Sequence, residues 1–88
     1  MPKKKRIYTE EERAVMVEIG QNIRKFRLGK TWTQRELAIM AFNYPSDSKS
    51  KNAASKKIYA LEHGVREQRI TELIAIAKAL KINLKDLF

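Results

Sequence analysis

Apolar residues recur along this chain at intervals of three and four, the spacing of amphipathic α-helices. The first such series is Val15, Ile19, Ile23 and Phe26. Thr9 precedes it with Glu12 three positions later, a pairing typical of a helix N-terminus, so we expect a helix from there to about Leu28. Gly29 is then expected to adopt the left-handed conformation that ends many helices.

A second helix is predicted to begin after Thr33, where Glu36 again stands three positions later. Its apolar side is Leu37, Ala38 and Ala41. It must end before Pro45, because proline lacks an amide hydrogen and restricts the residue before it. Residues 43–52 are rich in turn-forming types and are predicted to be an exposed loop.

The remaining apolar positions predict three more short helices. The third contains Ile58 and Leu61 and ends at Gly64. The fourth has the apolar series Ile70, Leu73, Ala77 and Leu80. Asn83 is expected to cap a last short helix. No useful stretch alternates with period two, so the prediction is an all-α fold of five helices, with residues 9–88 as one domain and residues 1–8 as a flexible basic arm.

The charge is unevenly distributed and favours an anionic partner. The chain has 88 residues, 19 of them Lys or Arg and 10 Asp or Glu, for a net charge of +9. Residues 1–6 are basic, and residues 24–57 hold nine basic side chains against Glu36 and Asp47. Clustering of this kind is typical of a surface that binds nucleic acid or anionic lipid, although charge also serves solubility alone.

The residue types exclude several other classes of function. There is no Cys, and His63 is the single His, so we expect neither a metal site nor a cofactor. No Ser–His–acid set and no phosphate-binding glycine loop is present, so an enzyme is not expected. The longest uncharged apolar stretch, residues 73–77, is too short to cross a bilayer, and the first residues lack the apolar core of a signal peptide. We therefore expect a cytoplasmic protein, nucleoid-associated if its anionic partner is DNA.

Four segments, in their order along the chain, resemble the lambda-repressor-like (XRE/Cro-type) helix-turn-helix family. They are IGQNIRKFR (19–27), TWTQRELA (31–38), KIYALEHG (57–64) and LIAIAKALKINLKDLF (73–88). The resemblance implies a five-helix DNA-binding domain whose third helix enters the major groove. Relative to the family, the chain has about ten extra residues between the two motif helices. We expect this Ser/Lys-rich insertion to face DNA; the alternative is a solvated loop without contacts.

The resemblance assigns roles to individual residues. It implies an ion pair between Arg27 and Glu62 that holds the third helix to the first. It implies base-facing side chains at Ser55, Lys56, Tyr59 and Ala60. Contacts to phosphate from the motif helices, the insertion and the arm are expected at Gln34, Arg35, Lys57, Lys49, Lys51, Lys3, Lys4 and Lys5.

The leading interpretation is a sequence-specific DNA-binding transcriptional regulator, a repressor that binds a palindromic operator as a homodimer. The dimer seam is expected at Leu84, Leu87 and Phe88, with half-sites roughly 34 Å apart on double-stranded DNA. The alternative is the antitoxin of a toxin–antitoxin pair, which would bind a toxin and also regulate its own promoter. A membrane-surface or RNA-binding module is disfavoured, because the apolar faces are needed for the core and no sheet is predicted.

Overall fold

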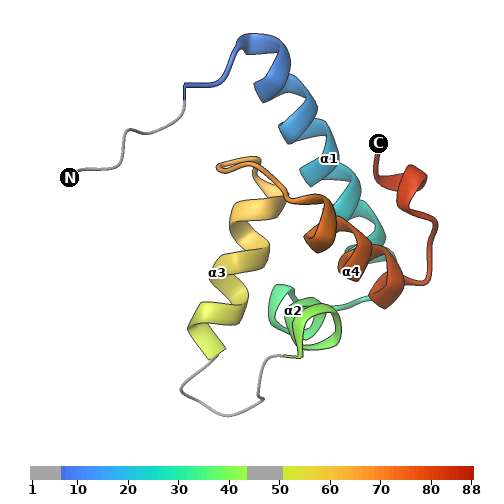
Figure 1. Ribbon diagram of the computed structural model, residues 1–88. Coiled ribbons are helices and arrows are strands. Elements are labelled where there is room, and N and C mark those ends of the chain that lie inside the picture. Colours follow the sequence, from blue (N-terminus) through green and yellow to red (C-terminus); the bar gives the residue numbers. More distant parts are fainter. Residues whose placement is uncertain (1–6, 44–50) are drawn as a thin grey trace.

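The computed structural model of the protein describes residues 7–43 and 51–88. These residues form four α-helices and one short 3-10 helix, η1, with no strand among them (Figure 1). Their bounds are α1 Glu10–Gly29, α2 Gln34–Phe42, α3 Lys51–Glu62, α4 Ile70–Leu80 and η1 Leu84–Leu87. The all-α prediction is confirmed. The prediction of five helices is corrected to four α-helices, because the last segment makes only a single 3-10 turn.

Capping places the starts of α1 and α2 where the sequence predicts them. The hydroxyl of Thr9 accepts a hydrogen bond from the Glu12 amide at 3.1 Å, and the Glu12 carboxylate accepts one from the Thr9 amide at 2.9 Å. Thr33 and Glu36 repeat this arrangement at α2, with the same two distances. Each box provides side-chain acceptors for two backbone N–H groups, which have no carbonyl partner because no helical turn precedes them.

Two residues of the predicted apolar faces lie outside the core. Val15 is 48% exposed and Ile70 is 54% exposed. Met16 and Ile76 are buried instead. The buried stripe of α1 begins at Met16 and continues at intervals of three and four through Ile19, and Val15 lies about 100° away from it around the helix.

The end of α1 differs from the prediction. Gly29 is still helical, and Thr31 adopts the left-handed conformation, with φ at 60°. The Thr31 amide donates to the Leu28 carbonyl at 2.9 Å and the Trp32 amide donates to the Arg27 carbonyl at 3.2 Å, the pair of bonds of a Schellman motif. A β-branched residue in this conformation is unusual. The sequence pointed to Gly29 because glycine is the common residue there.

The end of α2 and the start of α3 frame the predicted loop. Asn43 has φ at 55° and its amide donates to the Ile39 carbonyl, so α2 ends before Pro45 as predicted. Helix α3 begins at Lys51. Residues 44–50 of the predicted insertion lie outside the described residues.

Helix α1 crosses α3 at very short range because two glycines stand at the crossing. A Cβ atom on Gly20 would collide with the carbonyl oxygen of Glu62, and one on Gly64 would lie 3.0 Å from the backbone of Met16. Gly64 also has φ at 62°, and it ends α3 as predicted, with the Val65 amide donating to the Ala60 carbonyl at 3.1 Å. The crossing fixes the position of α3.

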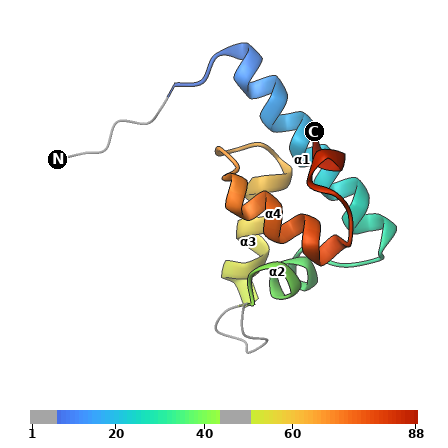
Figure 2. The ribbon, with the colours of Figure 1, turned by 45° about the vertical axis from the view of Figure 1, so that its right-hand side comes forward.

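The helices enclose one core. Helix α2 packs against α3 and α4, α1 runs across α3, and η1 returns to α1 beside the C-terminal end (Figures 1 and 2). The side chain of Asn22 donates to the Leu87 carbonyl at 3.0 Å and holds η1 in place. The largest fully buried side chains are Ile23, Leu37, Ile58, Leu61, Ile76, Leu80 and Leu87.

The arrangement places two of the three residues predicted as a dimer seam in or against the core of their own chain. Leu87 is fully buried in the core of its own chain, and Leu84 is half-buried against that core. Phe88 is 58% exposed and is the one member of the predicted seam that lies at the surface. Because η1 folds back on α1, Leu84 and Leu87 pack against the core of their own chain.

Candidate nucleic-acid interface

Helix α3 has a buried side and an outward side. Ala54, Ile58 and Leu61 are buried on the first. Lys56 and Tyr59 lie on the second and are exposed, Tyr59 by 51%. This division follows from the 3.6-residue period, which returns every third or fourth side chain to the same face.

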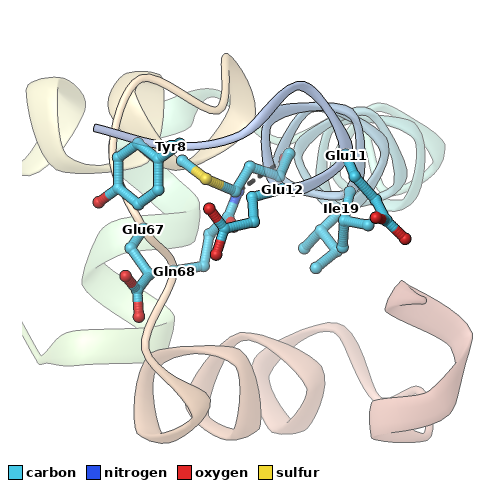
Figure 3. A pocket seen from close by; sticks show the side chains of 8 residues that line it. Tyr8, Glu11, Glu12, Ile19, Glu67 and Gln68 are labelled. Atoms are coloured by element: carbon cyan, nitrogen blue, oxygen red, sulfur yellow. Dashed lines mark hydrogen bonds between the residues drawn. The ribbon is translucent and has the colours of Figure 1, made fainter. Parts of the chain in front are cut away.

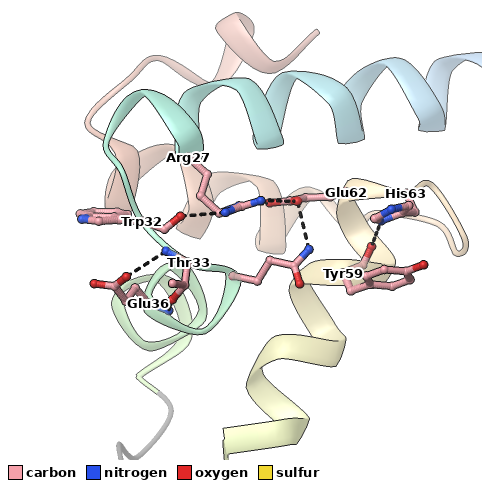
Figure 4. A network of polar contacts seen from close by, with 8 residues as sticks. Arg27, Trp32, Thr33, Glu36, Tyr59, Glu62 and His63 are labelled. Carbon is pink, nitrogen blue, oxygen red and sulfur yellow. Dashed lines mark hydrogen bonds and ion pairs between the residues drawn. The ribbon is translucent and has the colours of Figure 1, made fainter.

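The buried side of α3 is held by a polar network that includes Glu62. The guanidinium of Arg27 donates from Nε to Glu62 Oε2 at 2.6 Å and from Nη2 to Glu62 Oε1 at 3.1 Å (Figure 4). The Glu62 side chain is fully buried and that of Arg27 is 9% exposed. The structure contains the ion pair that the family resemblance implies, and its two parallel bonds fix both side chains.

The same network extends to α2. Nη1 of Arg27 donates to the Trp32 carbonyl at 2.7 Å, and Nε2 of Gln34 donates to Glu62 Oε1 at 3.2 Å. Gln34 was expected to contact phosphate, but its amide group has a partner inside the protein. Side chains from α1, α2 and α3 thus meet at Glu62.

Lys57 also has partners within the protein. Its ammonium lies 3.4 Å from Glu72 Oε2, on α4, and 4.6 Å from the centre of the Phe42 ring, at the end of α2. Arg66 donates to the same Glu72 oxygen at 2.7 Å, and the Arg69 amide donates to Glu72 Oε1 at 3.0 Å. The phosphate contact expected for Lys57 therefore competes with an internal ion pair.

These contacts determine the ionisation of Glu72. Burial by itself would raise the pKa of this carboxyl group, but the hydrogen bonds from Arg66 and the Arg69 amide, together with the charges of Arg66 and Lys57, lower its pKa to about 2. Glu72 is therefore a carboxylate at neutral pH. It joins α3, α4 and the segment between them.

Tyr59 and His63 form a stacked aromatic pair on the outward side of α3. Their ring centroids are 3.9 Å apart, with 20° between the ring planes. His63 Nδ1 lies 2.9 Å from the Tyr59 carbonyl oxygen (Figure 4). A carbonyl only accepts hydrogen bonds, so Nδ1 carries the hydrogen and Nε2 is the ring nitrogen left for other partners. Lys56 and this pair give the outward face one cation and one aromatic surface.

The other predicted site residues are distributed as follows. Ser55 and Ala60 are half-buried at the borders of the outward face, and Arg35 is half-buried in the first turn of α2. Lys51 is the first residue of α3, and its side chain lies outside the description. Lys3, Lys4, Lys5 and Lys49 belong to the residues that the structure does not describe. Of the expected base-facing set, Lys56 and Tyr59 are the exposed members.

A hollow of about 400 Å³ lies elsewhere, between the start of α1 and the segment after α3 (Figure 3). Its floor is apolar and includes Met16 and Ile19, and its rim carries Glu11, Glu12 and Glu67. Carboxylates at a rim repel phosphate, so this side of the molecule is a poor surface for nucleic acid. The acidic hollow and the outward face of α3 therefore differ in charge.

The described part of the chain does not meet the requirements of a metal site or of a membrane span. Within residues 7–43 and 51–88, no three His, Asp or Glu side chains are grouped so that they could hold a metal ion. No helix in those ranges is long and apolar enough to cross a membrane. Comparison of the chain with protein-family models, with curated proteins and with solved structures finds no match.

Sequence reasoning missed two features of this region. The Tyr59–His63 pair was detectable in principle, because residues four apart on a helix are neighbours. The Glu72 cluster was not, because it joins residues from α3, α4 and the segment between them, and their distances depend on how the helices pack.

Proposed function

We propose that this chain is a sequence-specific DNA-binding regulator that places the outward face of α3 in the major groove. The observation that carries the proposal is that one side of α3 is held by contacts with α1 and α2, whereas side chains on its other side are exposed to solvent. Glu62 and the glycine crossing lock its inner side to α1 and α2, while Lys56 and Tyr59 on its outer side remain exposed. An α-helix fits the major groove, and a rigidly mounted helix presents its side chains in one register.

The distribution of charge along the chain favours an anionic partner. Residues 24–57 hold nine basic side chains against two acidic ones, and this range contains α2 and the first part of α3. The acidic rim formed by Glu11, Glu12 and Glu67 lies at the other end of α3, beside the start of α1. Within the basic range, Lys56 is exposed on the outward face of α3, whereas Arg27 and Lys57 form ion pairs inside the protein. A duplex is attracted to the basic range and repelled by the acidic rim.

The residue types on that face determine what it can read. Lys56 can pair with a phosphate or with the O6 and N7 acceptors of guanine, and the Tyr59 ring can contact the methyl group of thymine. Residues 53–63 contain no Arg, Asn or Gln, the side chains that pair bidentately with purines most often. We therefore expect modest discrimination per base pair. A small domain bound over a promoter would act as a repressor by excluding other proteins.

Selection of bound duplexes from a randomised library tests the proposal. The enriched sequences are expected to contain a symmetric site whose halves are roughly 34 Å apart, one turn of the double helix. Lys56→Ala and Tyr59→Ala should each lower the enrichment of the selected site or reduce the base preference at its positions. Lys85→Ala is the matched control, because Lys85 is an exposed lysine on η1, away from α3. A selection that enriches no sequence would refute sequence-specific binding.

A further inference from the structure

Exposed apolar side chains gather on the surface shared by α2 and α4. Met40 on α2 is 58% exposed and Ile74 on α4 is 40% exposed. Both line a hollow of about 440 Å³ between the two helices. Met40 also lines a second hollow, of about 160 Å³, beside Trp32 and Ile39. The two hollows meet at Met40 and make one apolar surface, which we call the α2–α4 face.

The α2–α4 face carries charges of both signs. Glu36 lines the hollow beside Trp32, whereas Lys78 and Lys81 line the hollow beside Ile74. In a dimer with two-fold symmetry, the same patch meets itself, and each residue contacts a different residue of the partner. A two-fold axis beside Met40 would place the hollow with Glu36 over the hollow with Lys78 of the second copy. The face is therefore complementary to itself in charge.

We propose that the α2–α4 face is the dimer interface, and that its occupant is a second copy of this chain. The inference rests on the proposed function in one respect, since a symmetric operator requires paired subunits. Met40 would lie near the axis, where its unbranched and polarisable side chain adapts to an identical neighbour. Lys56 and Tyr59, on the outward face of α3, line neither hollow and stay free for DNA. Leu87, a residue of the seam that the sequence predicted, is fully buried in its own chain.

Sedimentation equilibrium of the full chain and of single variants tests this interface. The wild-type protein is expected to form dimers at tens of micromolar. Met40→Glu and Ile74→Glu should each weaken dimerisation by about tenfold or more, because a carboxylate enclosed by apolar side chains loses its hydration. Val17→Glu is the matched control, because Val17 on α1 is also 40% exposed and lines neither hollow of the face. Its dimer should be unaffected.

A pair of variants tests the symmetric arrangement itself. Lys78→Glu should weaken the dimer, because it places a carboxylate opposite Glu36 of the second copy. The double variant Glu36→Gln/Lys78→Glu should recover it, because Gln removes the like charge and keeps the oxygen that accepts from the Thr33 amide. Circular dichroism of each variant verifies the fold. A wild-type protein that stays monomeric up to about 200 μM, unchanged dimerisation in Met40→Glu, or failure of the double variant to recover would overturn the interface.

Binding to DNA separates failure of this interface from failure of the proposed function. If the interface is right, a monomeric but folded Met40→Glu variant still binds a duplex with a single half-site. A monomeric wild-type protein that binds DNA overturns the interface and leaves the function standing. A dimer that Met40→Glu dissociates but that binds no DNA supports the interface and refutes the function.

Discussion

Replacing Glu62 by Gln is expected to be severely destabilising. The substitution keeps the size of the side chain and removes its charge. It leaves the guanidinium of Arg27, 9% exposed, without a counter-charge, and one of the acceptors for Arg27 and Gln34 becomes a donor. Breaking one half of a buried pair costs about 3–5 kcal/mol. A domain of 88 residues has a free energy of unfolding of about 4–13 kcal/mol, so much of it would be lost.

Urea unfolding followed by circular dichroism and by fluorescence measures the loss. Trp32 is the single tryptophan and its carbonyl accepts from Arg27, so its emission reports on the network directly. The melting temperature should fall by roughly 15–30 °C. The double variant Arg27→Met/Glu62→Leu should recover most of the loss, because an apolar pair leaves no charge unpaired. Glu18→Gln, a neutralisation at an exposed position on α1, is the control.

The reasoning would be refuted by either of two results. One is a cost for Glu62→Gln below about 1 kcal/mol, the range of exposed ion pairs, which would mean that water reaches the network. The other is a double variant as unstable as the single one, which would mean that the shape of the two side chains, and not the unpaired charge, determines the cost.

Three further predictions concern stability, each measured by urea unfolding. Gly20→Ala should cost about 1–3 kcal/mol or more, because its methyl group meets the Glu62 carbonyl, whereas Gly29→Ala, with nothing within 4 Å, should gain about 0.5–1 kcal/mol. Thr31→Gly should gain about 1 kcal/mol, since φ at 60° strains a side chain with a Cβ atom, and an unchanged stability would contradict this. The pKa of Glu72 is about 2 in the folded state and 4.5 ordinarily, so its ionised form stabilises the fold by up to about 3 kcal/mol. This stabilisation is present above pH 4.5 and is lost as the pH falls toward 2. Glu72→Gln should remove this pH dependence of the free energy of unfolding.

Local signals in the sequence predicted the helix starts correctly. Thr9 with Glu12 and Thr33 with Glu36 form the expected boxes, because these bonds join residues only three apart and depend on nothing distant. A prediction that rested on a single residue type, the end of the first helix at Gly29, was less accurate. Gly29 was a reasonable helix end, but the chain turns at Thr31, where Trp32 can pack against the core and its amide can reach the Arg27 carbonyl.

The environments of several residues depend on how the helices pack and could not be predicted from the pattern of apolar and polar positions. The sequence alone does not show whether an apolar residue near the C-terminus, such as Leu87, packs in the core of its own chain or against a second copy. The burial of Leu87 becomes visible only in the structure, where η1 returns to α1. Lys56 and Lys57 are adjacent and identical in type. Their difference in environment comes from Glu72 on α4, which one lysine can reach from its side of α3.

The salt dependence of DNA affinity tests the central claim most directly. Fluorescence anisotropy with a labelled duplex gives the binding constant of the wild-type protein, Lys56→Ala and Lys85→Ala between about 50 and 300 mM salt. The account predicts a wild-type log–log slope steeper than about −3, a slope shallower by about one unit for Lys56→Ala, and no change for Lys85→Ala. No measurable binding, or equal losses in the two lysine variants, would contradict the claim that the outward face of α3 binds DNA.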